Sequence, residues 1–218
     1  MVKVEGIYRD REKIGQEVLT DEKRFEVFMK NGNKERFFRS IDEGIDFSLF
    51  IHHVNWAKRS RMRGYFFINL KPSTLVKYSR EIVHVLDRKI VVEIREDFLT
   101  DEEVEIIKRL REDFPFLLSI DDMGKGASNL DRVRELLPNF IKLDIKIIGS
   151  VSQLTFFVSF LREFAPRSIL IAEKVETEKD YRMIRGVGIK LWQGWYERQL
   201  RSAEKDEKEG VCSCGRGE

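Results

Sequence analysis

Short apolar runs alternate with longer amphipathic stretches along most of the chain. The short runs are apolar almost throughout, as in strands that are covered on both faces, whereas the longer stretches repeat apolar residues at helical spacing. Strands and helices that alternate in this way form a parallel sheet. The predicted strands lie at 65–69, 90–93, 116–120, 140–144, 169–172 and 189–192, and the predicted helices at 72–86, 100–111, 129–136, 151–164 and 177–185.

The beginning of the chain has a different pattern. Two β-prone runs, 2–8 and 14–19, flank a polar turn and predict a hairpin. Residues 25–62 are mostly helical in pattern, with interruptions at 31–33 and at Gly44. With the hairpin, the predicted strands are enough for either an open doubly wound sheet or a closed barrel.

The ends of the strands favour the barrel, because nearly every predicted strand ends in a polar or acidic residue. In a barrel these ends converge on one mouth, where the catalytic residues of that fold lie. Carboxylates crowded there raise one another's pKa and need protons, a basic neighbour or divalent cations. Oxygen ligands suit Mg²⁺ or Mn²⁺, and an acidic two-metal mouth is typical of phosphoester hydrolysis. The residues concerned are Glu17, Asn69, Glu93, Asp121, Asp122, Asp144, Glu173 and Gln193.

A simpler interpretation applies to any one of these positions, since strands commonly end where the chain meets water. For the whole series this interpretation is weaker, because Glu17, Asn69 and Glu93 interrupt apolar runs, where an unpaired polar group is costly. Lys142 precedes Asp144 by two residues on one strand, so both side chains are expected on the same face. One lysine cannot neutralise the whole acidic set.

Composition limits the class of partner. The 218 residues carry 40 Lys and Arg against 38 Asp and Glu, a net charge of +2. This balance argues against binding of DNA or RNA duplexes and predicts dense surface ion pairing. The 36% of charged residues, with few Asn and Gln, favours a thermophilic source.

The chain is predicted to be one barrel domain, 1–200, followed by a charged, disordered tail, 201–218, which lacks apolar periodicity. No apolar run approaches the length of a membrane helix, and the N-terminus lacks the apolar region of a signal peptide. We therefore expect a cytoplasmic protein without a membrane partner. Cys212 and Cys214, both in the tail, exclude a disulfide framework.

Seven segments, in order, resemble the EAL domain family of cyclic di-GMP phosphodiesterases, from about residue 4 to residue 196. Each match is short, but their order and their placement at strand ends make the resemblance specific. The segments are Glu17-Val18-Leu19, Ile68-Asn69-Leu70, Glu93-Ile94-Arg95-Glu96, Asp121-Asp122-Met123-Gly124, Lys142-Leu143-Asp144, Ala172-Glu173-Lys174-Val175-Glu176 and Gln193-Gly194.

The resemblance implies an α/β, TIM-barrel-like (β/α)8 barrel with one antiparallel strand, which accounts for the hairpin. It also implies a homodimer that hydrolyses cyclic di-GMP to the linear dinucleotide at a two-metal site of Mg²⁺ or Mn²⁺. By this resemblance, one metal would be held by Glu17, Asn69, Glu93 and Asp121, and the second by Asp121, Asp122 and the catalytic Glu173. Lys142 would orient or deprotonate the attacking water, and Gln193, Asp144 and Glu176 would bind the substrate. Glu96 would brace the loop after Asp122.

The chain departs from the family pattern around the substrate. Thr20-Asp21 stands where the family has Leu-Arg, so a cation expected at a substrate phosphate is missing, and Arg24 is a candidate replacement. Lys125 and Lys174 replace a usual Thr and Gly. An alternative function is therefore a weak or inactive relative that acts as a cyclic di-GMP sensor or protein-interaction module. Trp192 and Trp195 are predicted either to stack on guanine or to be core and rim residues.

Overall fold

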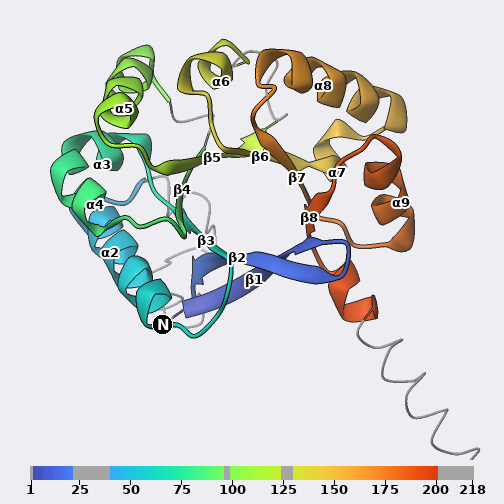
Figure 1. Ribbon diagram of the computed structural model, residues 1–218, viewed down its shortest axis with the longest axis horizontal. Helices are drawn as coiled ribbons and strands as arrows, with labels where there is room; N and C mark the ends of the chain where they lie inside the picture. Colours follow the sequence, from blue (N-terminus) through green and yellow to red (C-terminus); the bar gives the residue numbers. More distant parts are fainter. Residues whose placement is uncertain (1, 22–39, 96–98, 124–129, 201–218) are drawn as a thin grey trace, which may run out of the picture.

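The computed structural model describes residues 2–21, 40–95, 99–123 and 130–200. Within them, the strands form a closed barrel in the order β1 to β8, and helices surround it (Figure 1). β1 is antiparallel to both β2 and β8, and the remaining neighbours are parallel. The predicted (β/α)8-type barrel with one antiparallel strand is confirmed. The strands are β1 (Val2–Arg9), β2 (Glu12–Thr20), β3 (Tyr65–Asn69), β4 (Ile90–Arg95), β5 (Leu117–Met123), β6 (Phe140–Asp144), β7 (Ile169–Glu173) and β8 (Leu191–Gln193).

The helices follow the predicted order with two differences. The predicted helix 72–86 is divided at Tyr78, whose φ of −110° and ψ of 26° leave the helical region, and the short α7 after β6 was not predicted. The helices are α2 (Glu43–Arg59), α3 (Pro72–Lys77), α4 (Ser79–Val85), α5 (Asp101–Asp113), α6 (Leu130–Leu136), α7 (Ile145–Ile148), α8 (Val151–Phe164) and α9 (Glu178–Gly186).

The sequence signals at helix starts are mostly confirmed. Thr100 and Glu103 form the predicted capping box at the start of α5. Gly44, predicted as an interruption, lies instead in the first turn of α2, where its N–H donates to Asp42 at 2.7 Å. The remainder of the predicted 25–62 helix lies largely outside the described residues, as does the predicted tail.

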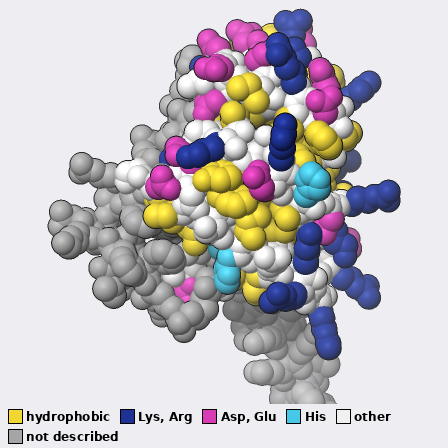
Figure 2. Space-filling model, turned by 90° about the vertical axis from the view of Figure 1, so that its left-hand side faces the viewer, with side chains coloured by type: hydrophobic (Ala, Val, Ile, Leu, Met, Phe, Trp, Pro, Cys, Tyr) yellow, Lys and Arg dark blue, Asp and Glu magenta, His cyan; other side chains and the backbone are white. Residues whose placement is uncertain are grey.

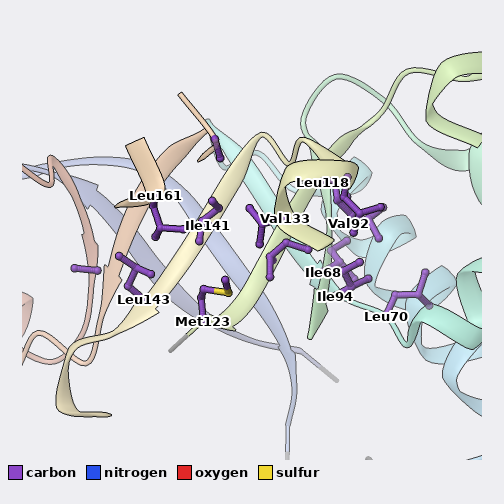
Figure 3. Close-up of a cluster of buried hydrophobic side chains, with 14 of the residues drawn as sticks. Ile68, Leu70, Val92, Ile94, Leu118, Met123, Val133, Ile141, Leu143 and Leu161 are labelled. Carbon is purple, nitrogen blue, oxygen red and sulfur yellow. The ribbon is translucent and has the colours of Figure 1, made fainter. Parts of the chain in front are cut away.

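Alternate residues along the strands divide the core in two. One set points into the barrel and forms an apolar layer of Ile7, Phe67, Val91, Phe140, Ile171 and Leu191. The other set points outward to the helices, and Figure 3 shows Ile68, Val92 and Ile141 in this outer cluster together with Val133 of α6 and Leu161 of α8. Because β3 to β8 are largely apolar on both faces, they appear in the sequence as short apolar runs.

The outer surface carries charges of both signs. Figure 2 shows the face over α2 to α5, where basic and acidic side chains are interspersed with apolar ones. Exposed ion pairs include Arg109 with Glu105 at 2.9 Å and Arg182 with Glu178 at 2.6 Å, so the predicted surface ion pairing is confirmed. Within the described residues, no helix has the length and apolar character needed to cross a bilayer.

We expect Phe67→Ala to destabilise the barrel by about 3–5 kcal/mol, because it empties a fully buried position at the centre of the apolar layer. Phe67 contacts the Phe140 ring of the opposite wall at a centroid distance of 5.0 Å. Denaturant unfolding provides the measurement. The matched control is Phe156→Ala, at a position 73% exposed on α8, which should change the unfolding free energy by no more than about 0.5 kcal/mol. Equal effects of the two variants would contradict this layer as the centre of the core.

Candidate active site

A buried lysine surrounded by carboxylates lies in the barrel above the apolar layer. The Nζ atom of Lys142, on β6, lies 2.9 Å from Glu173, 3.1 Å from Glu93, 3.2 Å from Glu17 and 3.3 Å from Asp121. The four carboxylates come from four different strands, β7, β4, β2 and β5. We call these five residues the Lys142 cluster. The prediction that strand-end residues meet is confirmed for them.

Two predicted amide side chains adjoin the cluster. Asn69 donates to Glu17 Oε1 at 3.0 Å, and Gln193 donates to Glu17 Oε2 at 2.7 Å. Gln193 also lies 3.3 Å from Glu5 on β1. Sequence reasoning missed Glu5, although the register of the hairpin pairs it with Glu17 and could have placed it there. Every strand of the barrel therefore contributes one polar side chain to this region.

The residue pattern explains this convergence. Glu93 follows Val91 by two residues, Lys142 follows Phe140 and Glu173 follows Ile171, so each polar residue shares the inward face of an apolar-layer residue, one step nearer the C-terminal end. Gly194 closes the end of β8. Its φ is +151°, and a Cβ there would lie 2.3 Å from the Val175 carbonyl oxygen, so only glycine allows this approach.

The charges of the cluster do not balance, and burial makes this costly. Burial raises the pKa of Glu93 well above its usual range, as do the neighbouring charges of Asp121, Glu17 and Glu173, which together outweigh Lys142. Burial and the charge of Asp121 likewise raise the pKa of Glu173, and burial raises that of Asp121. Glu17 differs: burial opposes its ionisation, but Lys142, Gln193 and Asn69 outweigh burial and lower its pKa.

The surrounding carboxylates favour the protonated form of Lys142. Burial alone would lower its pKa, but the four carboxylates outweigh burial and raise its pKa well above the usual value. A protonated ammonium donates hydrogen bonds and cannot accept a proton. In this metal-free arrangement a protonated Lys142 can orient a water molecule, and its two predicted roles, orientation and deprotonation of the attacking water, both stay predictions.

Asp122 lies beside the cluster and not in it. Its partner is Arg95 of β4, at 3.3 Å. Asp121 and Asp122 are consecutive, so an ideal strand would point them to opposite faces. The register of β5 against β6 is irregular between Ile120 and Met123, and Asp122 has a φ of +57°. This irregularity directs Asp121 to Lys142 and leaves Asp122 on the neighbouring side, next to Arg95.

The structure places two predicted residues elsewhere. Asp144 is buried, accepts from the Lys146 N–H at 2.9 Å at the start of α7, and pairs with Lys174. Glu176 is exposed, 3.8 Å from Lys146. The Asp144 side chain serves as the α7 N-cap, and the partners of both side chains in the described structure are lysines outside the Lys142 cluster. Glu96, the predicted loop brace, lies outside the described residues, as does Arg24.

The segment after Glu17 contains no cation where the family has Arg. Thr20 lies 3.4 Å from Nε2 of His53. Burial, together with the neighbouring His52, lowers the pKa of His53 to about 4, so His53 is neutral at physiological pH.

Trp192 is fully buried and donates to the Asp10 carbonyl at 3.0 Å, so it is a core residue, whereas Trp195 is exposed.

The donor set of the cluster fits divalent cations. Glu93 Oε2 is buried and accepts no hydrogen bond within the described residues, and Asp121 Oδ1, also buried, has the 3.3 Å ion pair with Lys142 but accepts no hydrogen bond there. Oxygen atoms of this kind, from carboxylates and one amide, are the ligands that Mg²⁺ and Mn²⁺ prefer. As the side chains stand, no group of three acidic, His or Cys residues in the described ranges is arranged to hold a metal ion, since the Lys142 ammonium lies between the carboxylates.

The chain is a (β/α)8-type barrel protein with one antiparallel strand and with carboxylates at the mouth of the barrel. The EAL domain family model matches residues 33–198, more than half of the chain, and the chain belongs to this family. The match begins after β2, so Glu17 lies outside it.

Two curated relatives from Escherichia coli (strain K12) match the chain. The oxygen sensor protein DosP is 27% identical over 124 residues, which are 54% of this chain and 16% of DosP. The probable cyclic di-GMP phosphodiesterase PdeA is 25% identical over 146 residues, which are 60% of this chain and 20% of PdeA. The match therefore covers only a small part of each relative.

Among solved structures, BlrP1 of Klebsiella pneumoniae in complex with calcium and cyclic di-GMP has the same fold. The TM-score is 0.70 at 21% identity, and the alignment covers 89% of this chain and 54% of the BlrP1 chain.

We expect Glu93→Gln to stabilise the metal-free protein, and to do so more at about pH 8 than at about pH 5. A carboxyl group whose pKa is raised in the folded state contributes stability that is complete below its unfolded pKa of about 4.5 and is lost as pH rises through the folded value. Glutamine stays uncharged at every pH. The difference between variant and wild type should therefore increase with pH, by at most about 1.4 kcal/mol per pH unit.

Denaturant unfolding in the presence of a chelator measures this difference. Glu163→Gln, at an exposed position on α8, is the control and should show no such trend. A difference between Glu93→Gln and wild type that did not change with pH would contradict the assigned direction.

Proposed function

We propose that the chain is a metal-dependent phosphodiesterase that hydrolyses cyclic di-GMP to the linear dinucleotide. The observation that carries the proposal is the Lys142 cluster, in which four carboxylates from four strands share one ammonium. Family membership supports the reaction class, and the ligand of BlrP1, together with the name of PdeA, supports the substrate. The two-residue departure at Thr20-Asp21 indicates altered substrate recognition.

We further propose that the site holds Mg²⁺ or Mn²⁺. BlrP1 has been solved with cyclic di-GMP and either calcium or manganese. Glu17, Asn69, Glu93 and Asp121 would hold one ion, and Asp121, Asp122 and Glu173 the second. Bound divalent cations supply a nucleophilic hydroxide near neutral pH and offset the charge of the attacking and leaving oxygens.

The residues of the chain perform the remaining steps. The Lys142 ammonium donates hydrogen bonds to oxygen atoms and orients the attacking water. Gln193 is positioned by Glu17 and Glu5 and contacts the substrate from β8. Arg95 holds Asp122 at the rim of the mouth. The rigid strands position these groups relative to one another before the substrate arrives.

Glu17→Ala should abolish release of the linear dinucleotide, with a loss of roughly 10³-fold or more, the scale expected for a group essential to the reaction. The measurement is chromatography of the products after incubation with cyclic di-GMP and Mg²⁺ or Mn²⁺, at elevated temperature as well. The control is Glu12→Ala, an exposed position on the same strand, which should retain wild-type turnover.

Binding of cyclic di-GMP by the wild type without turnover would instead support the alternative, a nucleotide sensor. No binding at all would point to a protein-interaction module.

Removal of metal should stop turnover and leave the barrel folded, because the Lys142 ammonium partly offsets the acidic charge when no metal is bound. Addition of Mg²⁺ or Mn²⁺ should restore the reaction. The measurement is dinucleotide release and circular dichroism with a chelator, before and after metal is added. Turnover that continues in the chelator would contradict the metal requirement.

Four further predictions remain proposals. They are a homodimer, a cytoplasmic location, a thermophilic source, and a single domain at 1–200 with a disordered tail at 201–218. Size-exclusion chromatography and a thermal melt test the first and the third.

A further inference from the structure

Lys174 has an unusual backbone conformation at the rim of the mouth. It directly follows Glu173 at the end of β7, and its φ is +57°. Residues with a Cβ rarely adopt this left-handed conformation, whereas glycine adopts it at no cost. Lys174 therefore keeps its place beside Glu173 at a conformational cost, which makes its side chain a candidate for a role there.

The side chain of Lys174 extends from β7 to the end of β6. Its Nζ pairs with Oδ2 of Asp144, and the register of the two strands places Asp144 opposite Glu173. Asp144 is completely buried, while the Lys174 side chain is 53% exposed. Because Lys174 directly follows Glu173 and reaches Asp144 at the end of β6, its ammonium lies close to the acidic mouth.

The other cations near the described strand ends are already engaged. Lys142 is buried among four carboxylates, and Arg95 pairs with Asp122. Lys71 donates to the Ile41 carbonyl, and Lys146 pairs with Asp180. Lys174 differs from Lys142 and Arg95 because more than half of its side chain faces solvent. Asp144 would also keep the Lys146 N–H as a donor if Lys174 turned away.

We propose that Lys174 binds a phosphate of the cyclic dinucleotide, namely the phosphodiester that is not being cleaved, and that Asp144 positions Lys174 for this contact. The assignment rests on the proposed function. Lys174 directly follows Glu173, so its ammonium adjoins the Lys142 cluster, while its Nζ pairs with Asp144 outside the cluster. This position at the edge of the site is the reason for assigning it to the phosphodiester that is not cleaved. A cation at the rim complements the charge of a dianionic ring that approaches an acidic mouth. Lys174 then supplies the positive charge that Thr20-Asp21 does not.

The test compares Lys174→Gln and Lys174→Gly with Lys179→Gln, an exposed lysine on α9 that serves as the control. Lys174→Gln should raise the KM for cyclic di-GMP about tenfold, the scale of one charge-assisted hydrogen bond, and change kcat less than about twofold. Hydrolysis of bis(p-nitrophenyl) phosphate, which carries a single phosphodiester, should be unchanged. Lys179→Gln should change neither reaction.

Lys174→Gly separates binding from structure, because glycine relieves the backbone strain and removes the ammonium. Its melting temperature should be no lower than that of the wild type, and its KM for cyclic di-GMP should still be about tenfold higher. An unchanged KM in either Lys174 variant would overturn the proposal, whatever the melting temperature. A parallel loss against bis(p-nitrophenyl) phosphate would overturn the assignment to the second phosphate.

Failure of the proposed function gives a different result. If the wild type hydrolyses neither substrate, the phosphodiesterase is excluded, and direct titration with cyclic di-GMP decides the role of Lys174. A Kd about tenfold weaker in Lys174→Gln would support phosphate binding in a sensor. An equal Kd, or no binding by the wild type, would overturn it.

Discussion

The burial of Lys142 is the constraint on which the rest of the site depends. A fully buried ammonium is tolerated only with partners, and its partners come from β2, β4, β5 and β7. None of these strands can supply the cluster alone, so the cluster forms only when the barrel closes. Buried ion clusters of this kind are weak contributors to stability, and an apolar layer of the same volume would usually serve stability as well or better. Stability alone therefore does not account for the cluster, which supports the proposed function.

The barrel interior is divided into an apolar layer, which stabilises the fold, and a polar layer, which forms the candidate site. The apolar layer lies toward the strand N-termini and provides the burial that stabilises the barrel. The polar layer lies one inward position further along each strand. Two inward positions that are two residues apart on one strand, for example Val91 and Glu93, lie in the apolar layer and in the candidate site, respectively. The rigidity of the first layer fixes the spacing of the second.

Much of this arrangement could be predicted from the sequence, because it depends on local patterns. The apolar strands, the Thr100 capping box and the polar strand ends all follow from the residues themselves. What could not be predicted depends on tertiary contacts. Tyr78 divides a helix without a Gly or Pro signal at that position, and the irregular register of β5 separates Asp121 from Asp122. Asp144 has the same strand-end position as the cluster carboxylates, yet it caps α7.

The charge of the whole chain conceals the charge of the site. A net charge of +2 coexists with four buried or partly buried carboxylates around one ammonium, a local imbalance of three if all are ionised. The raised pKa values of Glu93 and Glu173 show the cost of that imbalance without metal. Lys142 offsets one charge and keeps the carboxylates close together. Lys142 therefore holds the carboxylates together in the absence of metal, and neutralising the remaining negative charge requires further positive charge, which divalent cations can provide.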